Sequence, residues 1–184
     1  MSAELRSFLT GTIALDVMLV GALLLTLARR EVPAERTAWR RLALVLAIAI
    51  GVQGVHFLEE WATGFHHRFP ELLGLVPWSA SLWVSFNLAW IAIWGLALAG
   101  LLAGRRAALF PVWFLAVACA ANGVAHPLLA LAAGGYFPGL WTSPLAGLVG
   151  GVLCARLASF TGPAAAGEPA PTVQAGLRKG ILSE

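Results

Sequence analysis

Charged residues are scarce in this sequence. Aspartate, glutamate, lysine and arginine make up 11% of its 184 residues, whereas soluble domains carry about 25%. Hydrophobic residues make up 59%, and the mean hydropathy is +0.82. These values indicate a membrane protein. The formal net charge is only +3 and the basic residues cluster in expected loops, so no nucleic-acid partner is indicated.

The sequence contains only two cysteines, and its first apolar run lacks the features of a signal peptide. Cys119 and Cys154 lie in apolar segments without a CxxC or Cys/His metal spacing, so we interpret them as small buried thiols. A signal peptide carries its positive charge before the apolar stretch. Here Arg29 and Arg30 follow the first apolar run, and Asp16 interrupts it. We therefore expect this run to be a retained helix.

Five apolar runs have the length of a transmembrane helix, about 17 to 25 residues. Because lipid offers backbone groups no hydrogen-bond partner, the runs are expected to be helices. The sequence predicts an all-α, polytopic membrane helical bundle over residues 1–160 and a disordered cytoplasmic tail, rich in Pro, Gly and Ala, over 161–184. The predicted helices cover about residues 8–28, 42–62, 79–103, 107–133 and 141–160.

The basic residues predict the orientation of this bundle. Residues 29–41 hold five arginines against two glutamates, and residues 104–106 and 156–179 add further basic side chains. With five helices these segments fall on one side, which the positive-inside rule assigns to the cytoplasm. We therefore expect the N-terminus outside and the C-terminus cytoplasmic, in a plasma membrane, which in bacteria is the inner membrane.

The opposite side is expected to carry an aromatic belt. Tryptophan prefers the level of the lipid headgroups, and four tryptophans flank the expected outer loops, 63–78 and 134–140. His66 and His67 are expected to be solvated residues of the first loop. The belt would consist of Trp61, Trp78, Trp83 and Trp141.

Ionisable residues gather at the outer end of the second run, in the stretch "HFLEE". His56 precedes Glu59 by three residues and Glu60 by four, so all three share a helix face and are predicted to converge on one point. With a rise of about 1.5 Å per residue, His56 lies roughly 9 Å and Glu60 roughly 3 Å below the outer end of the helix.

Polar residues of the other helices fall at a similar depth. Asp16 and Asn87 lie roughly 12 Å below the outer ends of their helices, and His126 roughly 10 Å. Asn122 is one turn deeper than His126, and Thr142 stands at the start of the fifth run. Because the helices alternate in direction, residues far apart in sequence meet at one level. The sequence therefore predicts a single polar site in the outer half of the bilayer.

The residue types at this site suit two kinds of chemistry. Imidazole and carboxylate groups of His56, Glu60 and His126 make a site for a divalent metal, Zn or Fe. The same groups serve as an acid and a base. Asn87, Trp90 and Thr142 are expected to bind the substrate. Catalytic roles are expected for His56, Glu59, Glu60, His126 and Asn122.

Three stretches resemble motifs of the HXXEE domain family, multi-pass membrane proteins of unknown function. "HFLEE" (56–60) resembles the motif that names the family, "NGVAH" (122–126) its asparagine–histidine motif, and "GYFPGLWTSPL" (135–145) its third motif. The resemblance spans about residues 8–160 and implies that His56, Glu59, Glu60, Asn122 and His126 are important, but it supplies no reaction. The architecture is also similar, at lower weight, to that of the emopamil-binding protein family, which shifts a sterol double bond by proton transfer.

Three functions remain open from the sequence. The first is an intramembrane enzyme acting on a lipid-like or small apolar substrate, as a metal-dependent hydrolase or a proton-transfer isomerase. The second is a proton or metal-ion transporter, against which the apolar inner halves of the helices argue. The third is a non-catalytic membrane subunit. Glycines within "GLVGG", residues 147–151, permit close packing within one chain or between chains of an oligomer.

Overall fold

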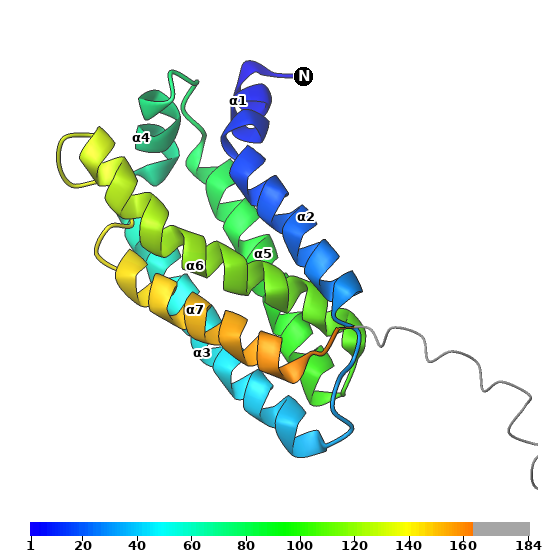
Figure 1. Ribbon diagram of the computed structural model, residues 1–184. Coiled ribbons are helices and arrows are strands. Elements are labelled where there is room, and N and C mark those ends of the chain that lie inside the picture. The colour runs from blue at the N-terminus through cyan, green and yellow to red at the C-terminus, as the bar shows by residue number, and fades with distance from the viewer. Residues whose placement is uncertain (164–184) are drawn as a thin grey trace, which may run out of the picture.

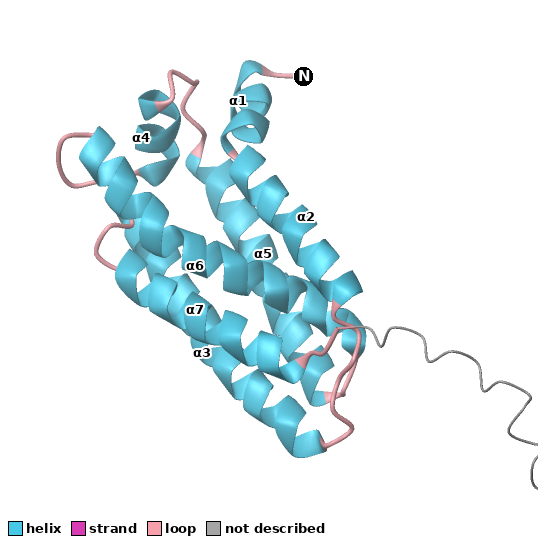
Figure 2. Cartoon of the chain, in the orientation of Figure 1, coloured by secondary structure: helices cyan, strands magenta, loops and turns pink. Residues whose placement is uncertain are grey.

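The computed structural model describes residues 1–163, and these form a bundle of helices (Figures 1 and 2). The prediction of an all-helical fold is confirmed for them, since their only extended pairing is one isolated bridge between Glu31 and Gly162. The predicted tail lies outside the described residues from position 164 onward. The elements are α1 (Ala3–Gly11), α2 (Ile13–Ala28), α3 (Arg36–Ala62), α4 (Phe65–Leu72), α5 (Ala80–Leu102), η1 (Arg106–Ala108), α6 (Leu109–Ala132) and α7 (Ser143–Phe160).

Four spans are long and apolar enough to cross a membrane: α3, α5, α6 together with η1, and α7. A fifth span exists if α1 and α2 count as one broken helix. These helices are those of a membrane protein. They lie side by side along the bundle, with α1 and α4 at the end that carries the N-terminus, called here the N-terminal end (Figure 1).

The predicted first helix is wrong as a single rod, because α1 and α2 meet at Thr12 with a bend of 49°. The Thr12 N–H bonds to the Phe8 carbonyl, and the Thr12 carbonyl accepts from the N–H groups that begin α2. A tertiary contact explains the break. A Cβ on Gly11 would lie 2.9 Å from Cη2 of Trp78, so only glycine lets the chain pass this close to the indole.

The predicted outer loop 63–78 contains a helix, α4, which begins after Gly64 in a left-handed conformation (φ 77°). His67 is exposed as expected, but His66 is buried, so its prediction as a solvated residue is wrong. The Trp78 N–H bonds to the His66 carbonyl and draws the segment inward. Burial lowers the pKa of the His66 imidazole, and the neighbouring His67 lowers it further.

The predicted tryptophan belt is only half correct. Trp61 and Trp141 are 52% and 77% exposed, whereas Trp78 and Trp83 are buried. The Trp78 indole N–H donates to Oγ of Ser7 at 3.0 Å. The two buried indoles form a small core at the N-terminal end together with Phe8, Phe65 and Phe137.

Helices α6 and α7 pack with their backbones in contact. A Cβ on Gly147 would lie 2.7 Å from Cα of Gly123, and one on Gly150 would lie 2.7 Å from Cβ of Cys119. The glycines of "GLVGG" that face α6 therefore allow close helix packing within one chain. The larger core follows the same contact toward the other end of the bundle, with Leu46, Leu115 and other fully buried side chains.

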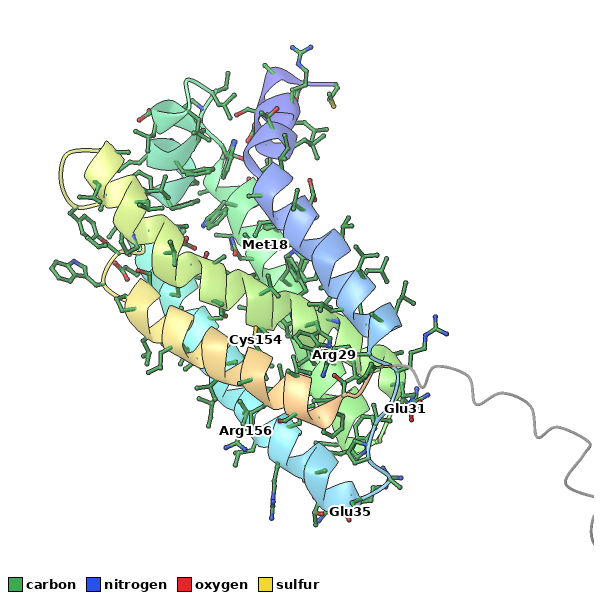
Figure 3. All side chains as sticks on the ribbon, viewed as in Figure 1. Met18, Arg29, Glu31, Glu35, Cys154 and Arg156 are labelled. Atoms are coloured by element: carbon green, nitrogen blue, oxygen red, sulfur yellow. The ribbon has the colours of Figure 1, made fainter. Side chains whose placement is uncertain are left out.

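The end opposite the N-terminus, called here the arginine end, carries the α2–α3 connection, the α5–α6 turn and the end of α7 (Figure 1). Arg29, Glu31, Glu35 and Arg156 lie toward it in Figure 3. Arg29 donates to Oγ1 of Thr161 at 3.0 Å and to the Ala158 carbonyl at 2.6 Å. Its positive charge thereby stabilises the C-terminal end of α7, where the helix dipole is negative. Thr161 is buried, so the predicted tail begins later than position 161.

Candidate metal centre

Two histidines and a glutamate meet between α3 and α6. Nε2 of His56 lies 3.2 Å from Nε2 of His126. Oε1 of Glu60 lies 3.5 Å from the first of these nitrogens and 3.3 Å from the second. All three side chains are buried, and they form a group that could hold a metal ion. The structure thus brings together the three residues that the sequence selected as metal ligands.

The hydrogen bonds of the two imidazoles define where their protons lie. Nδ1 of His126 is 2.7 Å from the Pro138 carbonyl, which only accepts, so this nitrogen carries the hydrogen. Oγ1 of Thr142 donates to Oε2 of Glu59 at 2.6 Å and therefore accepts from Nδ1 of His56 at 2.7 Å. When the rings are neutral, the Nε2 atom of each therefore carries a lone pair and no hydrogen, and this atom faces the centre.

With neutral rings and an ionised Glu60, three lone-pair atoms face one point and no hydrogen lies between them. Oε2 of Glu60 is also buried and has no hydrogen-bond partner among residues 1–163. Such a group is stabilised by a cation at its centre, a metal ion or a proton. A tetrahedral metal with ligand distances of about 2.0–2.1 Å separates its ligands by about 3.3–3.4 Å. The three separations in the structure cluster around that value, and the donor set suits zinc or iron.

Glu59 does not join this centre, so the predicted convergence of His56, Glu59 and Glu60 is wrong for Glu59. Its Oε1 accepts from the Tyr136 hydroxyl at 2.8 Å and the Trp141 N–H at 3.0 Å. Its Oε2 accepts two bonds from Thr142, from N–H at 2.8 Å and from the hydroxyl at 2.6 Å. Four donors match the acceptor capacity of an ionised carboxylate. Glu59 therefore orients His56 through the Thr142 hydroxyl.

The segment between α6 and α7 holds both imidazoles in place. Gly139 has φ 87°, and a Cβ there would lie 2.6 Å from Nδ1 of His126 and 2.9 Å from Cε1 of His56. Only glycine lets the turn lie against both rings. Burial raises the pKa of the Tyr136 hydroxyl, which therefore remains a donor to Glu59. Thr142 was expected to bind substrate, but it contacts Glu59 and His56 and does not line the cavity.

A cavity of about 500 Å³ adjoins the centre, with Glu60 and His126 in its wall. Small-molecule sites enclose about 300–1,000 Å³. Helices α1 to α6 contribute to the wall, and α7 does not. The wall is largely aromatic, with Phe57, Phe65, Phe69, Trp78, Trp83, Phe86, Trp90, Trp94 and Phe114.

Of the four other residues predicted to lie at the site level, three line the cavity and one does not. Asn87, Asn122 and Trp90 line it. Asp16 is exposed on the first turn of α2, because α2 restarts at the Thr12 break and turns this carboxylate outward. Its predicted place at the common site is wrong. Gln53 was not predicted, although its position one turn from His56 was a usable signal.

The mouth of the cavity lies between α2 and α6. Ala14, Leu128 and Ala132 line the cavity and are also exposed on the apolar surface of the bundle. Met18 lines it from further along α2 (Figure 3). Apolar side chains of these two helices therefore border the opening.

Comparison with known proteins finds no matching family model, no matching curated protein and no matching solved structure. The geometry defines the class of protein: a helical membrane protein with a buried cluster of two histidines and one glutamate beside an apolar cavity.

Proposed function

We propose that this protein is an intramembrane metalloenzyme that acts on a lipid-like or small apolar substrate. The observation that carries the proposal is the convergence of two imidazole lone pairs and one carboxylate oxygen, from His56, His126 and Glu60, at the wall of the cavity. Two histidines and one carboxylate are a donor set of catalytic zinc and of non-haem iron sites, which keep further coordination positions open. Here Glu60 and His126 line the cavity, so a metal held by them would be reached from it.

The bound metal would polarise a substrate oxygen or a water molecule. The chain supplies the rest. Thr142 and the Pro138 carbonyl fix the tautomers of His56 and His126, as the outer partners of metal-bound histidines do. The second oxygen of Glu60 is free to take a proton from a substrate or from water. The aromatic wall excludes water and thereby strengthens the electrostatic interactions of the centre.

We also propose that the chain belongs to the HXXEE domain family and that the site faces the outer leaflet of a plasma membrane. The support for the first is that the three stretches of the resemblance meet at one place: "HFLEE" supplies His56, "NGVAH" supplies His126, and the segment with Gly139 lies against both rings. The support for the second is that Arg29 and Arg156 lie toward the other end of the bundle, which also carries the arginine-rich α2–α3 connection and the α5–α6 turn.

Transport of protons or metal ions is less well supported. Between the cavity and the arginine end the described core is apolar and closely packed, and it consists largely of Leu42, Leu46, Leu101, Val112, Leu115, Leu153 and Leu157. A conducting path needs polar groups or water at this level. A purely structural role would need only a proton in place of the metal. It is less well supported because the cluster adjoins a cavity of the size of a small-molecule site.

The experiment is metal analysis of the full-length protein purified in detergent without chelators and supplied with zinc or ferrous iron. Wild type is expected to hold about one metal ion per chain, whereas His56→Ala and His126→Ala retain their helical content and lose the metal. His67→Ala is the matched control, since it removes an exposed imidazole and should leave the metal in place. Folded wild type that takes up neither metal would refute the proposal.

A further inference from the structure

Amide side chains gather around one cavity. The sequence contains only four, Gln53, Asn87, Asn122 and Gln174. The first three come from three helices, α3, α5 and α6, and all of them line the cavity. Gln53 and Asn87 are 3% and 6% exposed. Because burying an amide without a partner is unfavourable, their gathering around a single hollow points to a ligand that forms hydrogen bonds with them.

Contacts within the bundle relate the depths of the three amides. Sγ of Cys119 donates to Oε1 of Gln53 at 3.0 Å, and Asn122 lies about one turn from Cys119 on α6. Phe57, one turn from Gln53, has ring contacts with Trp83 at 6.5 Å and Trp94 at 6.3 Å.

These two tryptophans flank Asn87 on α5, so Asn87 lies near the level of Phe57 and its neighbour His56. Gln53 precedes His56, and Asn122 precedes His126, by about one turn. Gln53 and Asn122 therefore lie about 5–6 Å further from the N-terminal end than the metal centre, and Asn87 lies closer to the centre.

The three amides can each form further hydrogen bonds. Nδ2 of Asn87 donates to the Trp83 carbonyl at 2.9 Å, which leaves its oxygen free. Gln53 has its oxygen engaged by the Cys119 thiol, which leaves its N–H groups free. Asn122 has no side-chain hydrogen bond within residues 1–163. Together the three amides offer donors and acceptors but no charge, and Glu60 lies further toward the N-terminal end.

We propose that the cavity binds a hydrophobic alcohol, with its hydroxyl at Gln53, Asn87 and Asn122 and its hydrocarbon against the aromatic wall. A hydroxyl both donates and accepts, it needs no counter-ion, and a long or ringed hydrocarbon fits an aromatic cavity whose opening is bordered by apolar side chains. A bond a few atoms from the hydroxyl would then lie at the centre formed by His56, Glu60 and His126. This last point rests on the proposed function, whereas the binding itself does not.

The test uses a bromine-terminated long-chain alkanol and the matching bromoalkane as probes of the full-length protein in lipid nanodiscs. Bromine quenches tryptophan fluorescence at short range, and Trp78, Trp83, Trp90 and Trp94 line the cavity. The alkanol is expected to give saturable quenching that unlabelled undecanol reverses and undecane does not. Gln53→Leu and Asn122→Leu should each weaken alkanol binding by about tenfold, the loss expected for a buried hydrogen bond.

Thr26→Val is the matched control, because the Thr26 hydroxyl donates to the Ala22 carbonyl within α2, away from the cavity. Its alkanol affinity should equal that of wild type. Equal affinities of wild type for the alkanol and the bromoalkane, or unchanged alkanol affinity in both leucine variants, would overturn the proposal. His56→Ala separates the two hypotheses: it should lose metal and keep alkanol binding, so a failed metal test would leave the alcohol site standing, and the reverse also holds.

Discussion

Two adjacent glutamates have different tasks. Glu59 is held by four hydrogen bonds from the segment between α6 and α7, whereas Glu60 faces two imidazole nitrogens in a buried site. Neighbouring residues on a helix point about 100° apart, so the two carboxylates reach different surroundings. The spacing of "HFLEE" revealed that both are near His56. Which one meets His126 depended on a turn far along the sequence, which the spacing does not encode.

Thr142→Val tests the outer support of the centre. Without the hydroxyl, Nδ1 of His56 loses its acceptor and Glu59 loses one donor, so the imidazole is free to rotate and to take the other tautomer. We expect the affinity for zinc to fall about 10- to 100-fold, as is typical when such partners are removed. A competition titration with a zinc-binding dye measures it.

The control is Thr10→Val, in which the lost hydroxyl bonds only to the Arg6 carbonyl on the exposed side of α1. Equal zinc affinities for Thr142→Val and Thr10→Val would contradict the role of Thr142.

At the scale of the helices, the sequence predicted the spans well and their interruptions poorly. The ends of α5, α6 and α7 follow from long apolar runs bounded by charged or turn residues. Helix α3 begins at Arg36, before its predicted start at about 42, because the helix continues into the arginine-rich segment. Thr10, Gly11 and Thr12 are weak helix formers, but they did not by themselves predict a bend. At the bend Trp78 packs over Gly11, a contact between residues far apart in sequence. The Trp78 N–H also bonds to the His66 carbonyl, which draws α4 inward.

The packing of α6 on α7 predicts that Gly147→Leu destabilises the protein. The new side chain would meet the backbone of Gly123, and α7 would have to move away from α6. Overpacking of this kind costs about 1–3 kcal/mol. Thermal unfolding in detergent, followed by circular dichroism, measures the loss.

Gly151→Leu is the matched control, since a Cβ at Gly151 meets nothing within 4 Å. It should be neutral or mildly stabilising, because leucine favours the helix more than glycine does. If Gly147→Leu unfolds at the same temperature as Gly151→Leu, the close contact is not what holds the helix pair.

At the scale of the whole molecule, the alternating directions of the helices predicted that polar residues far apart in sequence meet at one site. The structure brings these residues to the centre or its cavity: His56, Glu60, His126, Asn87 and Asn122. Depth along a helix can be estimated from sequence, and direction around the helix here could not, because apolar residues occupy every face of a membrane helix. This is why Asp16 was placed inside although it faces outward, and why Thr142 was taken for a substrate contact.

The orientation of the whole molecule is tested with single cysteines at Ser2, Glu35 and His67, all exposed, in a chain whose Cys119 and Cys154 are replaced by alanine. With the N-terminus outside and five spans, a membrane-impermeant maleimide should label Ser2→Cys and His67→Cys in intact cells. Glu35→Cys should react only after permeabilisation. Labelling of Ser2→Cys and Glu35→Cys from the same side would mean that the broken pair α1 and α2 does not span.

The residues of the proposed metal centre and their supporting turn all come from the chain after position 35, whereas α1 and α2 contribute one side of the cavity wall. On the proposed function, substitutions before position 36 would change which molecules reach the cavity and leave the centre and the three amides unchanged. This stretch is therefore the natural one to vary in engineering access for a new substrate.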